Sequence, residues 1–140
     1  MLDQIDASTL KKYDKYNHSS LMKIAVRWCH DYIRARDNGK PCVNCGKHRP
    51  LQAGHFFAAG KYNKIRFCEY NIHGECLQCN YYNSQSHAHG YAKEIVNRIG
   101  KEDLEKLELK AVRGVYKYSR FELIGIIEYY KRKLKELKWK

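Results

Sequence analysis

Two Cys-x-x-Cys pairs constrain this chain more than any other feature of its sequence. The pairs are Cys42–Cys45 and Cys76–Cys79, with 30 residues between them. Paired cysteines in a small secreted protein indicate disulfides, whereas in a reducing compartment they more often bind zinc. The first residues contain neither the apolar segment nor the cleavage site of an export signal, so we expect a cytoplasmic protein. We therefore predict one structural Zn²⁺ site, in which four thiolates bind the ion tetrahedrally at about 2.3 Å.

The segment between the cysteine pairs is longer than that of a simple zinc finger, so a further structural unit is expected there. Short apolar or aromatic runs at 51–57 and 65–67, joined by a segment containing Gly60 and Asn63, predict a β-hairpin. A helix is expected from about residue 76 to about residue 84, and the sequence SHAHG (86–90) is expected to interrupt it. Cys29 and Cys68 have no such partner, and we interpret them as buried thiols.

Helical periodicity is clearest on either side of this central region. Apolar residues recur at helical spacing over 19–38, and further helices are predicted at 91–99 and 102–112. Ser119 and Glu122 form a capping-box pattern that predicts the start of a last helix. Residues 1–18 lack periodicity and are expected to form a flexible polar arm. The order of elements indicates an α+β fold in one domain, 19–140, with a core at 40–90 and a C-terminal helical region at 91–140.

Positive charge predicts the type of partner. Lys and Arg number 27 against 15 Asp and Glu, a net charge of +12, and no apolar run approaches the roughly 20 residues of a membrane span. We therefore expect branched or duplex DNA as the partner and no membrane. The cations expected to contact phosphate lie near the predicted hairpin and in the last helix: Arg34, Arg36, Lys61, Lys64, Arg66, Lys131, Arg132 and Lys133. A lysine-rich last helix also fits a merely solvated surface, and both interpretations stay open.

Three polar residues in the zinc motif point to hydrolysis of a phosphodiester. His55 lies in the first predicted strand, and a neutral imidazole is suited to deprotonating water near pH 7. Asn80 follows the fourth cysteine, and its amide oxygen is a suitable ligand for Mg²⁺ or Mn²⁺. Asn71 is expected to brace the loop that orients His55. Each of these three residues alone is more often structural. The following Tyr81 and Tyr82 could either stack on an unpaired base or pack in the core.

These motifs resemble those of a known nuclease superfamily. CVNCG (42–46), AGH (53–55) and NIHGECLQCN (71–80) are similar to the HNH or His-Me finger nucleases, in the CxxCN variant of the phage Holliday-junction resolvase endonuclease VII. More closely, the segment 32–137 resembles the NinG/Rap family of lambdoid phage recombination nucleases. The matching pieces include YIRARD (32–37), AGHFFAAG (53–60), IRFCEYNIHGECLQCN (65–80), VNRIG (96–100) and YYKRKLKEL (129–137).

The resemblance implies both a fold and an activity. The fold would be a zinc-clipped ββα-metal core flanked by an N-terminal helix and C-terminal helices. The activity would be metal-dependent cleavage of branched DNA, such as Holliday junctions or D-loops, by a homodimer in the cytoplasm of a bacterial host whose phage or prophage encodes it. His55 would be the general base, Asn80 a ligand of a catalytic Mg²⁺ or Mn²⁺, and the four paired cysteines the zinc ligands.

The sequence departs from the endonuclease VII pattern next to the base. That pattern has an aspartate metal ligand where this chain, like the NinG pattern, has Gly54. The second metal ligand is therefore open, with His73, Glu75, Asn83 and a backbone carbonyl near Gly54 as candidates. A Ser-Gly-Asn stretch typical after CxxCN is replaced by Ser84-Gln85-Ser86, and the roles of the following His87 and His89 stay open.

Two other functions compete with the branched-DNA nuclease. A non-catalytic, zinc-stabilised DNA-binding module is favoured by the absent aspartate. A sequence-specific HNH nuclease of the restriction or homing type would share the motif, but its usual additional DNA-reading domain has no room in 140 residues.

Overall fold

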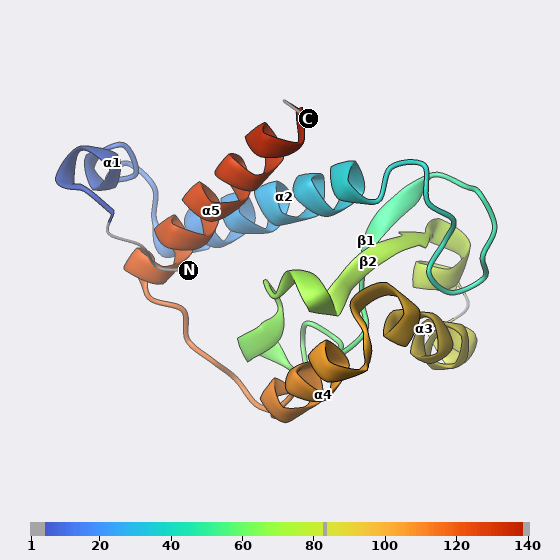
Figure 1. Ribbon diagram of the computed structural model, residues 1–140. Helices are drawn as coiled ribbons and strands as arrows, with labels where there is room; N and C mark the ends of the chain where they lie inside the picture. Colours follow the sequence, from blue (N-terminus) through green and yellow to red (C-terminus); the bar gives the residue numbers. More distant parts are fainter. Residues whose placement is uncertain (1–4, 83, 139–140) are drawn as a thin grey trace.

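A two-stranded antiparallel hairpin forms the centre of the chain in the computed structural model (Figure 1), which describes residues 5–82 and 84–138, with the backbone alone for 84–88. Strand β1 (Leu51–His55) pairs with β2 (Ile72–Cys76) in a register that places Leu51 opposite Cys76 and His55 opposite Ile72. The prediction of a second strand at 65–67 is wrong. Ile65 instead ends a 3-10 turn, η1 (Asn63–Ile65), and a second such turn, η2 (Glu69–Asn71), leads into β2.

The sequence of β2 does not predict a strand, because it lacks the alternation of a half-exposed strand. All five of its residues are buried, including His73 and Glu75. A strand covered on both faces shows no alternation of apolar and polar residues, and its polar side chains need hydrogen-bond partners from neighbouring elements. These hydrogen-bond partners come from segments distant in the sequence, so the residues around β2 do not identify them.

Two long helices pack against one another beside the hairpin, and the first of them contacts both strands. Helix α2 (His18–Arg36) begins where Asn17 Oδ1 accepts a hydrogen bond from the Ser20 N–H at 2.8 Å, and it lies beside α5 (Arg120–Lys138) (Figure 1). The predicted capping box of α5 is confirmed, since Ser119 and Glu122 each bind the other's backbone N–H at 3.0 Å. The larger apolar core lies between these helices and the hairpin, and it contains Leu21, Cys29, Ile33, Ala53, Phe67, Ile72, Leu123, Ile127 and Tyr130.

The N-terminal segment differs from the flexible arm that we expected for residues 1–18. It contains the short helix α1 (Ala7–Lys11), and the side chain of Tyr13 is buried. The Tyr13 hydroxyl donates to Glu128 at 2.5 Å, and Arg120 donates to the backbone oxygens of Tyr13 and Tyr16. These contacts are more than 100 residues apart in sequence, so local periodicity could not predict them.

Helices α3 (Ser84–Ile99) and α4 (Lys101–Lys110) lie on the other side of the hairpin (Figure 1). The expected interruption at 86–90 is wrong, because α3 runs through it. Gly90 is the point of close approach, since a Cβ atom there would lie 2.0 Å from Asn44 Oδ1. The helix expected from about residue 76 is a single π-helical turn, η3 (Gln78–Tyr82). A second, smaller core joins these elements through Val43, Ile65, Tyr91, Ile95 and Leu107.

A buried carboxylate fixes the two sides relative to one another. Asp37 directly follows α2 and is fully buried. It accepts hydrogen bonds from the Gly74 N–H at 2.7 Å and from the Arg36 guanidinium at 2.8 and 3.0 Å, and Arg98 of α3 lies 3.8 Å away. The Arg36 guanidinium holds the pKa of Asp37 at about 2 against the opposing effect of burial. The order of helices and strands confirms the prediction of an α+β fold. None of the described helices is long and apolar enough to cross a membrane.

Candidate metal centre and surrounding polar site

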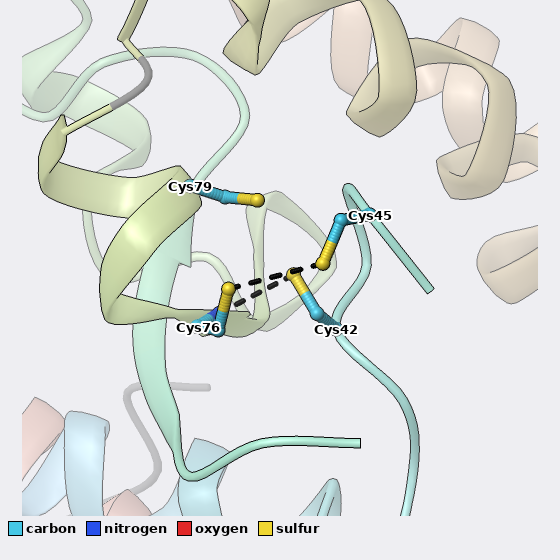
Figure 2. A group of neighbouring side chains, drawn as sticks. All are labelled: Cys42, Cys45, Cys76 and Cys79. Atoms are coloured by element: carbon cyan, nitrogen blue, oxygen red, sulfur yellow. Dashed lines mark hydrogen bonds between the residues drawn. The ribbon is translucent and has the colours of Figure 1, made fainter. Parts of the chain in front are cut away.

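The four predicted zinc ligands come together (Figure 2). The sulfur atoms of Cys42, Cys45, Cys76 and Cys79 all lie within 4.8 Å of one another, and those of Cys45 and Cys76 are 3.9 Å apart. Tetrahedral binding at about 2.3 Å requires sulfur atoms about 3.8 Å apart, so separations within 4.8 Å need changes of at most about 1 Å for the cluster to hold Zn²⁺. The prediction that the two pairs come together in one cluster is confirmed, and this cluster could hold a metal ion such as zinc.

Backbone hydrogen bonds shape the first cysteine pair for a metal. Cys42 Sγ accepts from the N–H groups of Asn44 at 3.4 Å and of Cys76 at 3.3 Å. The turn closes through the Gly46 N–H, which donates to the Cys42 oxygen at 2.9 Å, and Gly46 adopts the left-handed φ of 74° that glycine tolerates best. Val43 then binds the Gly74 oxygen of β2 at 2.9 Å. The cluster therefore fixes the end of the hairpin opposite His55.

His55 ends β1 with its ring held in one tautomer. Its Nε2 lies 2.8 Å from the backbone oxygen of Arg66. Because a carbonyl oxygen only accepts, the neutral ring carries its proton on Nε2 and has its lone pair on Nδ1. Burial lowers the pKa of His55 and outweighs the opposing effect of this hydrogen bond. The arrangement has the chemistry of a neutral, oriented base.

A second histidine, His30, lies beside His55 and belongs to no motif of the sequence. His30 of α2 packs with its ring edge toward His55, with 5.8 Å between the centroids and 60° between the planes. Burial lowers the pKa of His30 to about 4, and the nearby charges of His55, Arg34 and Arg66 act in the same direction. No local motif marks His30, because it lies among the apolar residues of an ordinary amphipathic helix.

Asn71 forms the predicted brace. Its side chain is fully buried, Oδ1 accepts from the Phe57 N–H at 2.8 Å, and Nδ2 donates to the Phe57 oxygen at 3.0 Å. The Asn71 oxygen also accepts from the Phe56 N–H at 2.9 Å. The chain that leaves His55 is thus fixed one and two residues after the imidazole.

Asn80 lies on the opposite face of the hairpin from His55. Its Nδ2 donates to Gln52 Oε1 at 3.0 Å, which leaves Oδ1 outside that hydrogen bond. Gln52 and His55 are three residues apart on β1, and alternation places their side chains on opposite faces of the strand. The roles expected for His55 and Asn80, a base and a metal ligand acting on one phosphodiester, require a shared cleft, and the strand does not present both side chains on one face.

The structure gives a physical reason for Gly54. A Cβ atom at this position would lie 2.4 Å from Glu75 Oε1 and 2.8 Å from Glu75 Cβ. The buried Glu75 side chain thus occupies the space next to Gly54, and its Oε2 accepts from Asn44 Nδ2 at 3.2 Å. An aspartate has no room before His55 while Glu75 keeps this conformation.

His73, a further candidate for metal binding, is only 3% exposed. Its Nδ1 lies 3.2 Å from the Tyr91 hydroxyl, which itself donates to the Gly54 oxygen at 2.7 Å. Burial lowers the pKa of His73 to about 3. These contacts favour a structural role. Asn83 and the side chain of His87 lie outside the described residues, and His89 is exposed on α3.

The predicted cationic residues differ in how far the protein already uses them. Arg36 donates to Asp37 and to the backbone oxygens of Glu69 and Ile72, which favours a structural role over contact with DNA. Lys61 and Lys64 are exposed, and Arg66 is half-buried with its guanidinium over the Phe67 ring.

The cations of α5 are engaged by aromatic rings and acids. Lys131 lies over the Trp28 ring and 3.7 Å from Glu128, while Arg132 and Lys133 both lie over Tyr129. These contacts favour the interpretation of this face as a folded, solvated surface.

The two tyrosines after Asn80 are exposed. Tyr81 and Tyr82 are 72% and 64% exposed, and their rings contact one another edge to face. Packing in the core, one of the two interpretations that their sequence allowed, is therefore wrong. Exposed aromatic rings next to a candidate site remain available to a ligand.

Comparison with known proteins places the chain in a family. A family model described as Bacteriophage Lambda NinG protein matches residues 3–140. Protein ninG of Escherichia phage 933W is 32% identical over 135 residues, which cover 95% of this chain and 66% of that protein. The ninG proteins of Escherichia phage lambda and Salmonella phage P22 are 31% and 30% identical, again over 95% of this chain and over 65% of each relative.

This chain thus spans just under two thirds of the length of these relatives. No solved structure matches it significantly. The extent of the family match and the identity to several phage proteins agree with one another, and the chain therefore belongs to the NinG family of bacteriophage proteins.

Proposed function

We propose that this chain is a metal-dependent endodeoxyribonuclease that hydrolyses branched DNA, such as Holliday junctions or D-loops, with His55 as the general base. The single observation that carries the proposal is the hydrogen bond from His55 Nε2 to the Arg66 oxygen, which fixes the orientation and the neutral tautomer of the ring. A base that is neutral near pH 7 and fixed in orientation is what removal of a proton from water requires. The resemblance of the AGH and CxxCN segments to HNH nucleases supports the same role.

The charges around His55 suit a phosphodiester substrate. Arg66 acts electrostatically on both His55 and His30, and Arg34 acts on His30. Cations next to a neutral base attract an anionic phosphate without protonating the base, because the same positive charges lower the pKa of the imidazoles. Exposed Tyr81 and Tyr82 would stack on bases that are unpaired at a branch point.

Oxygen ligands for a divalent cation are present on the face of the hairpin that carries Asn80. The first proposed ligand is Asn80 Oδ1, whose side chain binds Gln52. The second is Glu75, the acidic residue of the two strands, which lies directly opposite Gln52 in the register. Amide and carboxylate oxygens are ligands that Mg²⁺ and Mn²⁺ accept. The ion would stabilise charge on the phosphoryl and leaving oxygens. The four-cysteine cluster would hold a separate, structural zinc ion.

The proposed assembly is a homodimer, because resolution of a symmetric junction requires one cut in each of two strands. The proposed place of action is the cytoplasm of the bacterial host, where phage recombination intermediates occur. Both statements rest on the nuclease function and are tested with it.

One observation favours the non-catalytic DNA-binding module instead. His55 and Asn80 project from opposite faces of β1, whereas a shared reaction centre requires both to reach the same phosphate. The nuclease proposal remains compatible with this geometry because His55 is the last residue of β1. A DNA backbone that crosses the end of this strand can contact both faces of the hairpin.

The experiment that separates the two functions is cleavage of a labelled four-way junction by the purified, zinc-loaded chain. The nuclease proposal predicts nicking near the branch that requires Mg²⁺ or Mn²⁺, with a linear duplex of the same sequences cut more slowly. Binding to the junction without nicking in either metal would favour the module. Cutting of the linear duplex at one sequence would favour a sequence-specific HNH nuclease.

A further inference from the structure

A basic pocket lies between the end of α2 and the loop that follows the first cysteine pair. Its volume is about 490 Å³, and the charged or titratable residues that line it are Arg34, Lys40, His48 and Arg49. None of the described residues in its lining is acidic. Leu51, the first residue of β1, forms part of the wall. The chemistry of the lining suits an anion, and its size suits a phosphate group together with its neighbouring sugar.

The cations of this pocket are only partly neutralised by the protein. Arg34 pairs with Asp31 one turn earlier in α2, and Lys40 lies 3.5 Å from Asp37, whose carboxylate is already engaged by Arg36. Arg49 is exposed, and no carboxylate in the described part of the chain lies within ion-pair distance of it. Unpaired positive charge in a concave surface concentrates the electrostatic field and attracts phosphate.

Both walls of the pocket are rigidly attached. The end of α2 is fixed by Asp37, which binds the Gly74 N–H of β2. The opposite wall follows the cysteine cluster, where the Cys42 N–H donates to the Lys47 oxygen at 2.9 Å. Side chains presented from fixed backbones lose less entropy when they bind a ligand. Bound zinc would therefore pre-organise this pocket as well as the hairpin.

The pocket and His55 lie at opposite ends of strand β1. Leu51 lines the pocket and His55 ends the same strand, four residues later. At about 3.3 Å per residue, this separation is about 13 Å. Neighbouring phosphates of a strand lie off the helix axis and are about 7 Å apart, twice the axial rise of about 3.4 Å, so this distance is roughly two nucleotide steps. We propose that the pocket binds a backbone phosphate of the DNA strand that crosses His55, about two nucleotides from the phosphate that is cut. This inference rests on the proposed function.

The test measures DNA binding and cleavage separately on the zinc-loaded full chain. Arg49→Gln removes one charge from the pocket, and Arg113→Gln is its matched control, because Arg113 is an exposed arginine in the 111–119 segment. Affinity for a fluorescein-labelled four-way junction is measured by anisotropy over a salt series, with Ca²⁺ replacing Mg²⁺. Arg49→Gln is expected to bind about 5- to 10-fold more weakly, with a log–log salt slope smaller by roughly 1, and Arg113→Gln to bind like wild type.

A second measurement identifies the ligand chemistry directly. Titration of the ¹⁵N-labelled chain with inorganic phosphate is expected to shift the amides of 34, 38–40, 48, 49 and 51, and Arg49→Gln is expected to abolish these shifts. The proposal is overturned if Arg49→Gln and wild type bind the junction with equal affinity and salt slope. Phosphate shifts at the pocket combined with unchanged junction binding would identify a site for free anions and would also overturn it. Absence of cleavage by a wild-type protein that binds the junction contradicts the proposed function and leaves this binding result intact.

Discussion

The side-chain amide of Asn71 and the backbone of Phe57 are joined by two hydrogen bonds, 2.8 and 3.0 Å long, across 14 residues of sequence. This pairing closes the loop that leaves β1 immediately after His55. The Arg66 oxygen that fixes the imidazole belongs to the same loop. The orientation of His55 therefore depends on an amide side chain that would not itself touch a substrate.

Substitution of Asn71 is expected to impair both stability and cleavage. Asn71→Ala leaves the Phe57 N–H and oxygen without their partner and should cost about 2–4 kcal/mol in the free energy of unfolding. Asn71→Asp keeps the acceptor for the N–H but turns a carboxylate oxygen toward the Phe57 oxygen. Single-turnover cleavage at a temperature where the variants stay folded should fall on the order of 100-fold, because the base is misplaced. Full activity in folded Asn71→Ala would show that the brace does not position His55.

Zinc binding is expected to contribute most of the folding free energy of the central region. Cys76→Ser removes one of four sulfur atoms that face a common centre, and structural zinc of this kind contributes on the order of 10 kcal/mol. We expect one zinc ion per wild-type chain by elemental analysis, and a Cys76→Ser chain that is unfolded by circular dichroism. Cys68→Ser, a half-buried cysteine outside the cluster, is the matched control and should retain both zinc and structure.

Acid is expected to destabilise the protein through His73 before carboxylates are protonated. The pKa of His73 in the folded chain is about 3, below its ordinary value of 6.5, because the ring is buried against Tyr91 near Arg36, Arg98 and Lys40. Between these two values the unfolded chain binds the extra proton, so the free energy of unfolding falls as the pH falls. The contribution is about 1.4 kcal/mol per pH unit.

Urea unfolding at several pH values from 6.5 to 4.5 measures this dependence. His73→Gln should reduce the slope by about 1.4 kcal/mol per pH unit and leave the part that the buried His30 and His55 contribute. His89→Gln, at an exposed histidine of α3, should leave the slope unchanged. Equal slopes for His73→Gln and wild type would mean that other groups control the acid transition.

Gly54 and Glu75 are expected to be energetically coupled. Gly54→Ala places a Cβ atom 2.4 Å from Glu75 Oε1, and such overpacking should cost about 1–3 kcal/mol. In a Glu75→Ala background this cost should fall, with a coupling energy of at least about 1 kcal/mol in a double-mutant cycle. Gly60→Ala meets no atom within 4 Å and serves as the control. Additive effects of the two substitutions would contradict the steric explanation for Gly54.

Features encoded locally were predictable from the sequence. The cysteine spacing identified the cluster, the apolar periodicity identified α2, and the capping box of Ser119 and Glu122 identified the start of α5. The helix and capping-box signals depend on residues a few positions apart. The cysteine signal depends on zinc binding, which requires all four thiolates together.

Features that depend on long-range burial were not predictable. The position of β2 depends on polar residues such as His73, whose partner Tyr91 comes from α3. The ordering of Tyr13 depends on Glu128, and the contact between His30 and His55 depends on how α2 crosses the hairpin. For the same reason, the motif that contains His55 and Asn80 does not reveal that strand alternation separates their faces.

The most direct test of the central claim is single-turnover cleavage of a four-way junction by His55→Ala in Mg²⁺. The account predicts a rate reduced about 10²- to 10⁴-fold, with junction affinity, zinc content and melting temperature like those of wild type and of an His89→Ala control. Cleavage by a folded, zinc-loaded His55→Ala chain at the wild-type rate would contradict the assignment of His55 as the base.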